Sequence, residues 1–139
     1  MINSFEGKYA FLSNFYDSPI VEDGITYPTN EHYFQAMKTM DSKQRQEIAA
    51  CDTPGKAKKL GRKVFLRPDW EEVKLGVMET GLRMKFSDPD LANKLIATGN
   101  EELIEGNWWG DTYWGVCNDV GENHLGKLLM KIRSELVNP

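Results

Sequence analysis

Apolar positions recur with a helical period along most of the chain beyond residue 30. Near the C-terminus the repeat is formed by Leu125, Leu128, Leu129, Ile132 and Leu136. This spacing of three and four residues predicts an amphipathic helix over about 122–136. Capping residues, prolines and glycines bound further helical stretches. These are predicted over about 30–40, 42–51, 54–60, 69–86 and 87–99.

The first 27 residues do not show this period. Asp23-Gly24 is a turn signal between two short β-prone segments, which predicts a hairpin of Ile20-Val21 with Ile25-Tyr27. Residues 101–105 are predicted to form a further strand and residues 106–121 to be irregular. A length of 139 residues is typical of one domain. The predicted fold is therefore α+β, a single helix-rich domain over residues 1–139 with a small sheet.

The net charge of −4 weakens, without excluding, an interpretation as a protein that holds long nucleic acid, because such proteins need basic surfaces for phosphate. One dense basic run is present, and it ends in Arg62-Lys63. We expect these two residues to be the phosphate contacts of a small or locally bound substrate.

The two cysteines are far apart and match no disulfide framework or thiolate metal site. No apolar run approaches the ~18 residues that a membrane span needs. We therefore expect a cytoplasmic protein with no metal or organic cofactor and no membrane association.

The predicted helix over 30–40 carries the candidate chemistry. Glu31, Gln35 and Lys38 fall on one side of it, opposite an expected core face of Tyr33, Ala36, Met37 and Met40. One interpretation is a solvated polar face. The other is a set of catalytic side chains held in fixed positions by a rigid helix. A carboxylate in the first helical turn is stabilised by the helix dipole, which suits Glu31 to charge stabilisation or to activation of water.

A second candidate segment runs from Asn107 to Trp114 and contains three of the four tryptophans. Trp108, Trp109 and Trp114 are either core residues or a stacking wall for a base. Asp111 is either a turn residue or a general acid/base. Asn123 lies at the start of the last predicted helix, where it either caps the helix or contacts a phosphate.

Several motifs together resemble the NADAR superfamily, whose best-known bacterial branch is YbiA-like. They are Leu12-Ser13-Asn14-Phe15, the segment from Tyr27 to Lys38, Gly61-Arg62, Trp70 with Val73-Lys74, Lys85-Phe86, Asp111 with Tyr113-Trp114-Gly115, and Asn123-His124-Leu125-Gly126 with Leu128-Leu129-Met130. The resemblance implies a YbiA-like fold and an N-glycosidase that cleaves a bond between ribose C1′ and an exocyclic nitrogen. It implies no cofactor and no obligate protein partner.

Two substrate classes follow from the resemblance. One is ADP-ribose on guanine, free or within DNA or RNA; the other is a phosphoribosylamino-pyrimidine of the riboflavin pathway. The YbiA-like branch typically continues Trp-Gly with Asp-Gly, whereas here Gly115 is followed by Val116-Cys117. The segment from Glu105 to Asp111 resembles the ADP-ribose branch instead. We therefore favour the ADP-ribose substrate. A non-catalytic nucleotide-binding module is the alternative from another class.

The resemblance and the residue pattern together define the expected site. The catalytic residues are Glu31, Lys38, which is expected to form a Schiff base, and Asp111. The substrate-binding residues are Ser13, Asn14, Phe15, Gln35, Arg62, Lys63, Asn107, Trp108, Trp109, Trp114 and Asn123.

Overall fold

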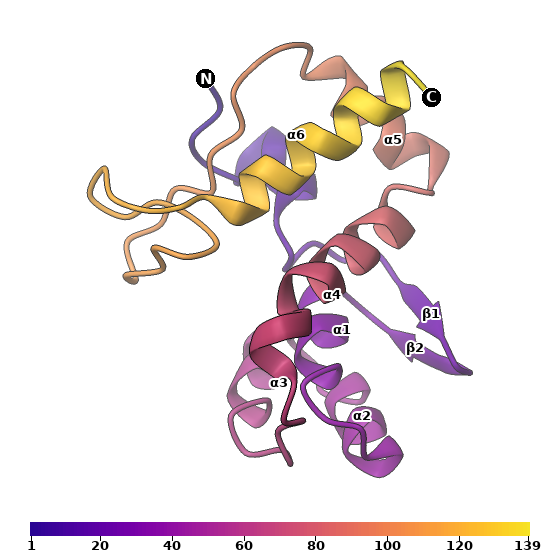
Figure 1. Cartoon of the computed structure of the whole chain (residues 1–139). Helices are drawn as coiled ribbons and strands as arrows, with labels where there is room; N and C mark the ends of the chain where they lie inside the picture. Colours follow the sequence, from indigo (N-terminus) through magenta and orange to yellow (C-terminus); the bar gives the residue numbers. More distant parts are fainter. The chain divides into compact units, whose positions relative to one another are not determined.

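The computed structural model describes all 139 residues, which form two compact units. Unit 1 contains residues 1–13 and 86–139, and unit 2 contains residues 14–85. Figure 1 labels the helices and strands of both units. The fold class is helix-rich α+β with a two-stranded antiparallel sheet, as predicted. None of the helices combines the length and the apolar character that a membrane span requires.

Unit 2 begins with the predicted hairpin and continues with four helices. Strand β1 (Ile20–Glu22) pairs antiparallel with β2 (Ile25–Tyr27), with Ile20 opposite Tyr27. The turn residues Asp23 and Gly24 have φ values of 52° and 76°, the left-handed conformation that a tight two-residue hairpin turn requires. The elements are β1 (Ile20–Glu22), β2 (Ile25–Tyr27), α1 (Asn30–Ala36), α2 (Ser42–Ala49), α3 (Pro54–Leu60) and α4 (Trp70–Lys85).

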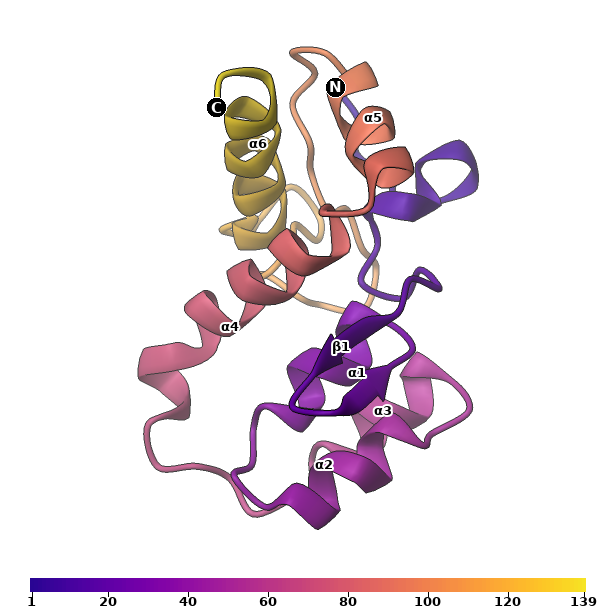
Figure 2. The ribbon, with the colours of Figure 1, turned by 90° about the vertical axis from the view of Figure 1, so that its right-hand side faces the viewer.

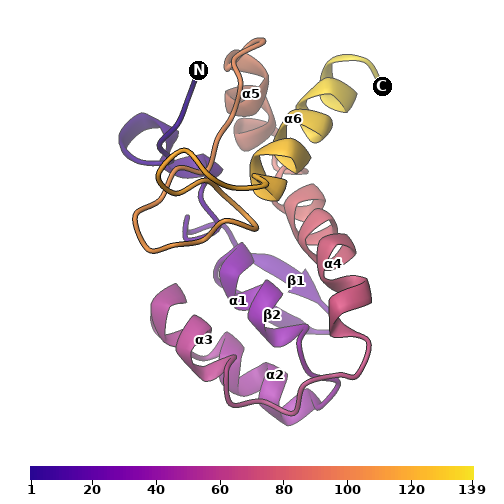
Figure 3. The ribbon, with the colours of Figure 1, turned by 60° about the vertical axis from the view of Figure 1, so that its left-hand side comes forward.

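Helix α1 is the centre of unit 2. It contacts β2, α2, α3 and α4 (Figure 3), and all seven of its residues are buried. Aromatic side chains anchor it on two sides. The Tyr33 ring lies edge-on to Tyr27 with centroids 5.5 Å apart, and the Phe34 ring lies 5.1 Å from that of Trp70. A helix enclosed in this way holds its polar side chains in fixed positions.

The predicted length of α1 is wrong, because the helix ends at Ala36 and not near residue 40. The residues after Ala36 are bonded to other parts of the unit. The backbone N–H of Arg67 donates to the Lys38 carbonyl at 2.7 Å, and Asp41 caps the next helix by accepting from the N–H of Gln44. Met40 therefore leaves the expected core face and is 64% exposed.

Unit 1 is built around α5 (Pro89–Ala97) and α6 (His124–Val137), which pack against each other (Figure 2). Their buried faces contribute Leu91, Leu95, Leu125, Leu129 and Ile132. A short 3-10 helix, η1 (Gly7–Leu12), lies in a region where the sequence predicted only strands and loops.

The connection between α5 and α6 is irregular. The strand predicted over residues 101–105 is absent, and only an isolated parallel bridge joins Leu103 to Ile2. One pairing does not make a strand, and the chain turns away after it. Helix α5 is capped by Asp88, whose side chain accepts a hydrogen bond from the N–H of Asp90.

Candidate functional site

The polar residues predicted on α1 are not a solvated face. Glu31 is only 7% exposed and Gln35 is also buried. The Gln35 Nε2 donates to the Glu31 Oε2 at 2.6 Å, so the amide fixes one carboxylate oxygen within the protein. A buried carboxylate is costly unless it is bonded, and its electrostatic influence is stronger there than in water.

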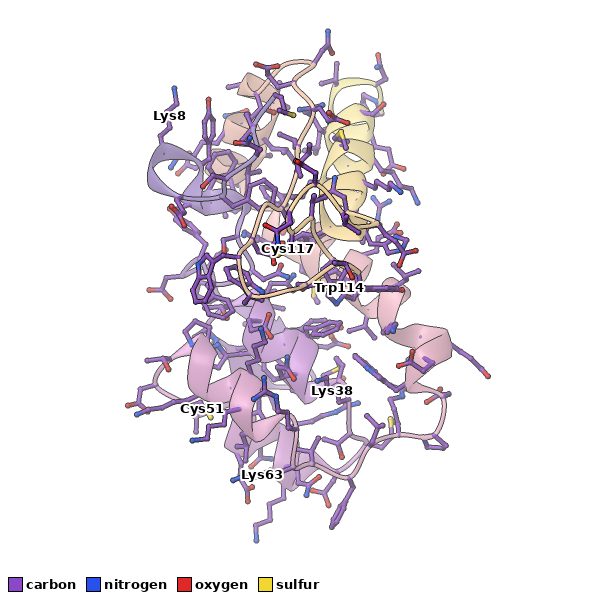
Figure 4. The ribbon with its side chains drawn as sticks, turned by 90° about the vertical axis from the view of Figure 1, so that its left-hand side faces the viewer. Lys8, Lys38, Cys51, Lys63, Trp114 and Cys117 are labelled. Atoms are coloured by element: carbon purple, nitrogen blue, oxygen red, sulfur yellow. The ribbon has the colours of Figure 1, made fainter.

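Lys38 follows the end of α1 and is partly buried (Figure 4). Burial lowers the pKa of its ammonium group. The charge of Glu31 opposes this effect, and the charges of Arg62 and Lys58 add to it. The Lys38 Nζ lies 6.0 Å from the centroid of the Phe34 ring. This environment increases the fraction of neutral amine, the form in which a lysine is a nucleophile.

Asn14 is positioned by a residue that sequence reasoning missed. The side chain of Asn30 is fully buried, and its Nδ2 donates to the Asn14 Oδ1 at 2.9 Å. The Glu31 backbone N–H donates to the Asn14 carbonyl at 3.0 Å. Asn14 and Glu31 are therefore held next to each other. Asn30 lies within the segment from Tyr27 to Lys38 that carries the family resemblance, but no role was predicted for it. The helix cap is Thr29.

Gln35 packs closely against the end of α3. A Cβ atom at Gly61 would collide with the Gln35 side-chain amide, so glycine is required for this approach. Arg62 and Lys63, which follow Gly61, are exposed, and Figure 4 shows Lys63 extending away from the helices of unit 2. The position of these two cations is compatible with phosphate contacts, which remain a prediction.

Lys85 is a buried lysine for which no role was predicted. It is 1% exposed, and burial lowers its pKa to about 7. Its Nζ lies 5.6 Å from the centroid of the Tyr16 ring. The signal was present in the sequence, because Lys85 follows Met78 and Leu82 on the apolar stripe of α4, where a lysine is unexpected.

In unit 1 the two neighbouring indoles of the loop before α6 are exposed. Trp108 is 85% exposed and Trp109 is 50% exposed. Their rings are nearly perpendicular, with an interplanar angle of 85° and centroids 5.6 Å apart. A core role is therefore wrong for both. Trp114 is partly buried, and its ring lies edge-on to Tyr113 at 4.9 Å.

Asn107 and Asp111 hold this loop in one shape. The Asn107 Nδ2 donates to the Asp111 carbonyl at 2.8 Å, and the Asp111 N–H donates back to the Asn107 Oδ1 at 3.0 Å. The Asp111 Oδ1 accepts from the N–H groups of Tyr113 at 3.1 Å and Trp114 at 2.9 Å. The turn role considered for Asp111 is confirmed, and its catalytic role remains a prediction.

The side chain of Asn123 does not cap α6. Asn123 is buried with a φ of 54°. Its Nδ2 donates to the Leu103 carbonyl at 2.9 Å, and its Oδ1 accepts from the Glu105 N–H at 3.0 Å. Both ends of the amide thus join the loop to the start of the helix. Ser13 lies at the end of η1, and Phe15, in unit 2, is exposed.

His32 is buried in a structural position. The His32 Nε2 donates to the Cys51 carbonyl at 2.9 Å, and its Nδ1 lies 2.8 Å from the Thr29 hydroxyl oxygen. The carbonyl can only accept, so this pairing places the proton on Nε2. No group of three or more His, Cys, Asp or Glu side chains is arranged to hold a metal ion.

Comparison with known proteins gives consistent matches along nearly the whole chain. The NADAR domain model matches residues 3–137. A protein of Shigella flexneri named N-glycosidase YbiA is 45% identical over 137 residues, which cover 96% of this chain and 85% of that protein. A riboflavin biosynthesis protein of Vibrio vulnificus is 36% identical over 133 residues, covering 93% of this chain and 36% of that protein. The NMR structure of YbiA from Escherichia coli has a TM-score of 0.85 and 42% identity, covering 99% of this chain and 85% of that one.

Proposed function

The chain belongs to the NADAR family, and from this premise we propose that it removes ADP-ribose from guanine bases in nucleic acid or nucleotides. Relatives that match along almost the whole chain are named N-glycosidases, and this chain is an enzyme of that kind. The bond cleaved joins ribose C1′ to the exocyclic nitrogen of the base. The observation that carries the proposal is the buried Glu31–Gln35 pair with the partly buried Lys38 one turn further on.

Glu31 has the environment for electrostatic catalysis. Cleavage at C1′ develops positive charge on the sugar, and a fixed carboxylate in a dry setting stabilises that charge more than an exposed one does. The hydrogen bond from Gln35 fixes one oxygen of the Glu31 carboxylate. The carboxylate therefore need not reorganise when the charge develops, and it is equally placed to orient water.

Lys38 has the environment for nucleophilic catalysis. Ring opening breaks the C1′–O4′ bond as the exocyclic nitrogen forms a C1′=N iminium and O4′ takes a proton. The neutral Lys38 Nζ then adds to C1′, and the exocyclic nitrogen leaves with a proton as the free amine of guanine. Water hydrolyses the resulting C1′=Nζ linkage, releasing the sugar aldehyde and the amine. The lowered pKa of Lys38 supplies the neutral form that this addition needs.

The exposed indoles support the ADP-ribose substrate. Such a substrate contains two aromatic bases, adenine and the modified guanine. Trp108 and Trp109 present two nearly perpendicular rings on a loop braced by side-chain hydrogen bonds. Stacking of a base on an indole contributes about 1–3 kcal/mol. Two exposed indoles exceed what a single pyrimidine ring requires.

A phosphoribosylamino-pyrimidine is the second candidate substrate. It is favoured by relatives named riboflavin biosynthesis proteins, one from Vibrio vulnificus and one, 40% identical over 129 residues, from Zea mays. It contains the same kind of bond, so the roles proposed for Glu31 and Lys38 apply to it without change.

The two substrates are separated by one mass-spectrometric assay with purified protein. A DNA oligonucleotide carrying ADP-ribose on guanine is expected to yield free ADP-ribose and unmodified guanine. Glu31→Gln and Lys38→Ala are expected to slow release by roughly 10²–10⁴-fold. Glu47→Gln and Lys43→Ala, exposed residues on α2, are the matched controls. Release from the phosphoribosylamino-pyrimidine alone would replace the ADP-ribose proposal with the second candidate, and binding without any product would favour the non-catalytic module.

The covalent step and the role of Asp111 have separate tests. Borohydride is expected to trap the sugar on Lys38, and activity with no adduct would remove the Schiff-base route. Asp111→Asn keeps a side-chain oxygen that accepts the turn hydrogen bonds but cannot transfer a proton as a carboxylate does. A general acid/base role therefore predicts a large loss of kcat with little change in stability, and near-normal kcat would contradict it.

A further inference from the structure

Unit 1 contains a groove of about 530 Å³ between η1 and α5. Helix η1 contributes Lys8, Tyr9 and Phe11, and α5 contributes Lys94 and Ala97. Figure 4 labels Lys8 on η1. Ile2, Thr98 and Glu101 complete the lining. None of these residues belongs to the predicted catalytic or substrate-binding set.

The groove carries cations that have no carboxylate partner. Lys8 and Lys94 form no ion pair. The Lys8 Nζ lies 5.1 Å from the centroid of the Tyr9 ring, and the Lys94 Nζ lies 6.0 Å from that of Phe11. Both ammonium groups are thus held beside aromatic rings.

The surroundings of the groove strengthen its positive charge. The buried Arg133 donates through Nη1 to the Thr98 hydroxyl at 2.8 Å, which places a guanidinium directly behind the lining. The only acid of the lining, Glu101, already accepts from the Met1 amino group at 2.8 Å. The chain as a whole has 21 acidic and 17 basic residues, so this local excess of cations runs against the overall charge.

We propose that this groove binds a nucleotide, either free or as part of a strand. Its volume falls in the range of small-molecule sites, roughly 300–1,000 Å³. Tyr9, with the apolar Phe11 and Ala97, offers a surface for a flat base. Lys8 and Lys94 supply the charge for a phosphate. The groove is therefore expected to bind a ligand in which an aromatic ring is joined to an anion. Either part alone is expected to bind more weakly.

The proposal is tested on the full chain by ¹H–¹⁵N NMR titration with AMP, adenosine, inorganic phosphate and a tetradeoxyadenylate. AMP is expected to shift the amide signals of η1 and α5, with at least about tenfold tighter binding than adenosine or phosphate alone. Tighter binding of the tetranucleotide than of AMP would identify a nucleic-acid strand as the ligand of the groove. Weaker binding of the tetranucleotide than of AMP would identify a free nucleotide as the ligand.

Two variants probe the two halves of the groove. Lys94→Glu reverses a charge and is expected to weaken AMP binding by about tenfold or more. Ala97→Trp fills the groove without changing charge and is expected to do the same. The matched control is Lys127→Glu, an exposed lysine on α6 in the same unit. Binding that is lost equally in the control, that phosphate reproduces alone, or that shifts no signal of η1 and α5 would overturn the proposal.

Failure of this proposal is distinguishable from failure of the proposed function. Lys94 is not among the residues proposed for N-glycoside cleavage, so Lys94→Glu is expected to keep hydrolysis of a short substrate in the absence of AMP. Loss of AMP binding with intact hydrolysis supports the groove as a separate site.

Discussion

Replacing Lys85 by methionine is expected to stabilise the protein, and the gain depends on pH in a way that the structure defines. Lys85 is 1% exposed and its pKa is lowered from 10.5 to about 7 by burial. Between about pH 7 and pH 10.5, Lys85 is protonated in the unfolded chain and not in the folded chain. Stability of the natural protein therefore rises with pH across this window, and the full penalty of the buried amine is present below pH 7.

The size of the effect follows from the two pKa values. A difference of 3.5, from 10.5 to about 7, corresponds to about 5 kcal/mol at 1.36 kcal/mol per pKa unit. Between pH 7 and pH 9 the change amounts to roughly 2–3 kcal/mol. Methionine has a similar length and no charge, so packing around α4 changes little. The stability gained by Lys85→Met is therefore expected to shrink by that amount as the pH rises from 7 to 9.

Urea unfolding of both proteins at constant ionic strength, at half-unit steps of pH, measures this difference directly. Other titrations, including those of the buried Tyr27 and Tyr33, occur in both proteins and cancel. Lys127→Met, at an exposed position, serves as the control and is expected to give a curve parallel to that of the natural protein. A constant gap between Lys85→Met and the natural protein would refute the reasoning, because it would mean that the folded protein keeps Lys85 protonated throughout.

Two further predictions concern α4 and the reaction. Gly81→Ala is expected to destabilise the protein by about 1–3 kcal/mol, because its Cβ would collide with the side chain of Asn30. Gly76→Ala on the same helix meets no atom within 4 Å and is expected to stabilise by about 0.5–1 kcal/mol; urea unfolding compares the two. The value of kcat/KM is expected to rise with pH and to level off below 10.5, since burial lowers the pKa of Lys38 and the neutral amine reacts. A pH-independent kcat/KM between pH 6 and pH 10 would contradict a nucleophilic amine.

Local signals in the sequence were sufficient to predict an element correctly where a short motif determines the backbone conformation. The Asp23-Gly24 turn identified the hairpin, and Pro54 and Gly61 identified the ends of α3. The predicted end of α1 was wrong because a tertiary contact determines it. The carbonyl of Lys38 accepts from the backbone of Arg67, almost thirty residues later, and no local pattern predicts that bond. The same holds for the single bridge that replaced the strand at residues 101–105.

Burial was harder to predict than position. Glu31 and Gln35 were assigned to the correct helix, yet a polar face on a helix is usually solvated, and only the surrounding β2, α2, α3 and α4 make this one buried. For Trp108 and Trp109 the sequence left a core role and an exposed stacking role open. Indoles usually contribute to a core, whereas here a loop braced by Asn107 and Asp111 exposes both.

Unit 2 contains buried polar atoms that folding alone does not explain. The Asn30 Oδ1 and the Gln35 Oε1 are buried without a hydrogen-bond partner, and each such atom costs about 1–3 kcal/mol. Both belong to amides whose nitrogen atoms bond to predicted site residues, Asn30 to Asn14 and Gln35 to Glu31. An apolar residue at either position would avoid the unpaired oxygen but would lose that positioning bond. The pattern therefore indicates that the interior of unit 2 is organised to hold Asn14 and Glu31 in place at the expense of stability, as expected of a site that must be rigid before its substrate arrives.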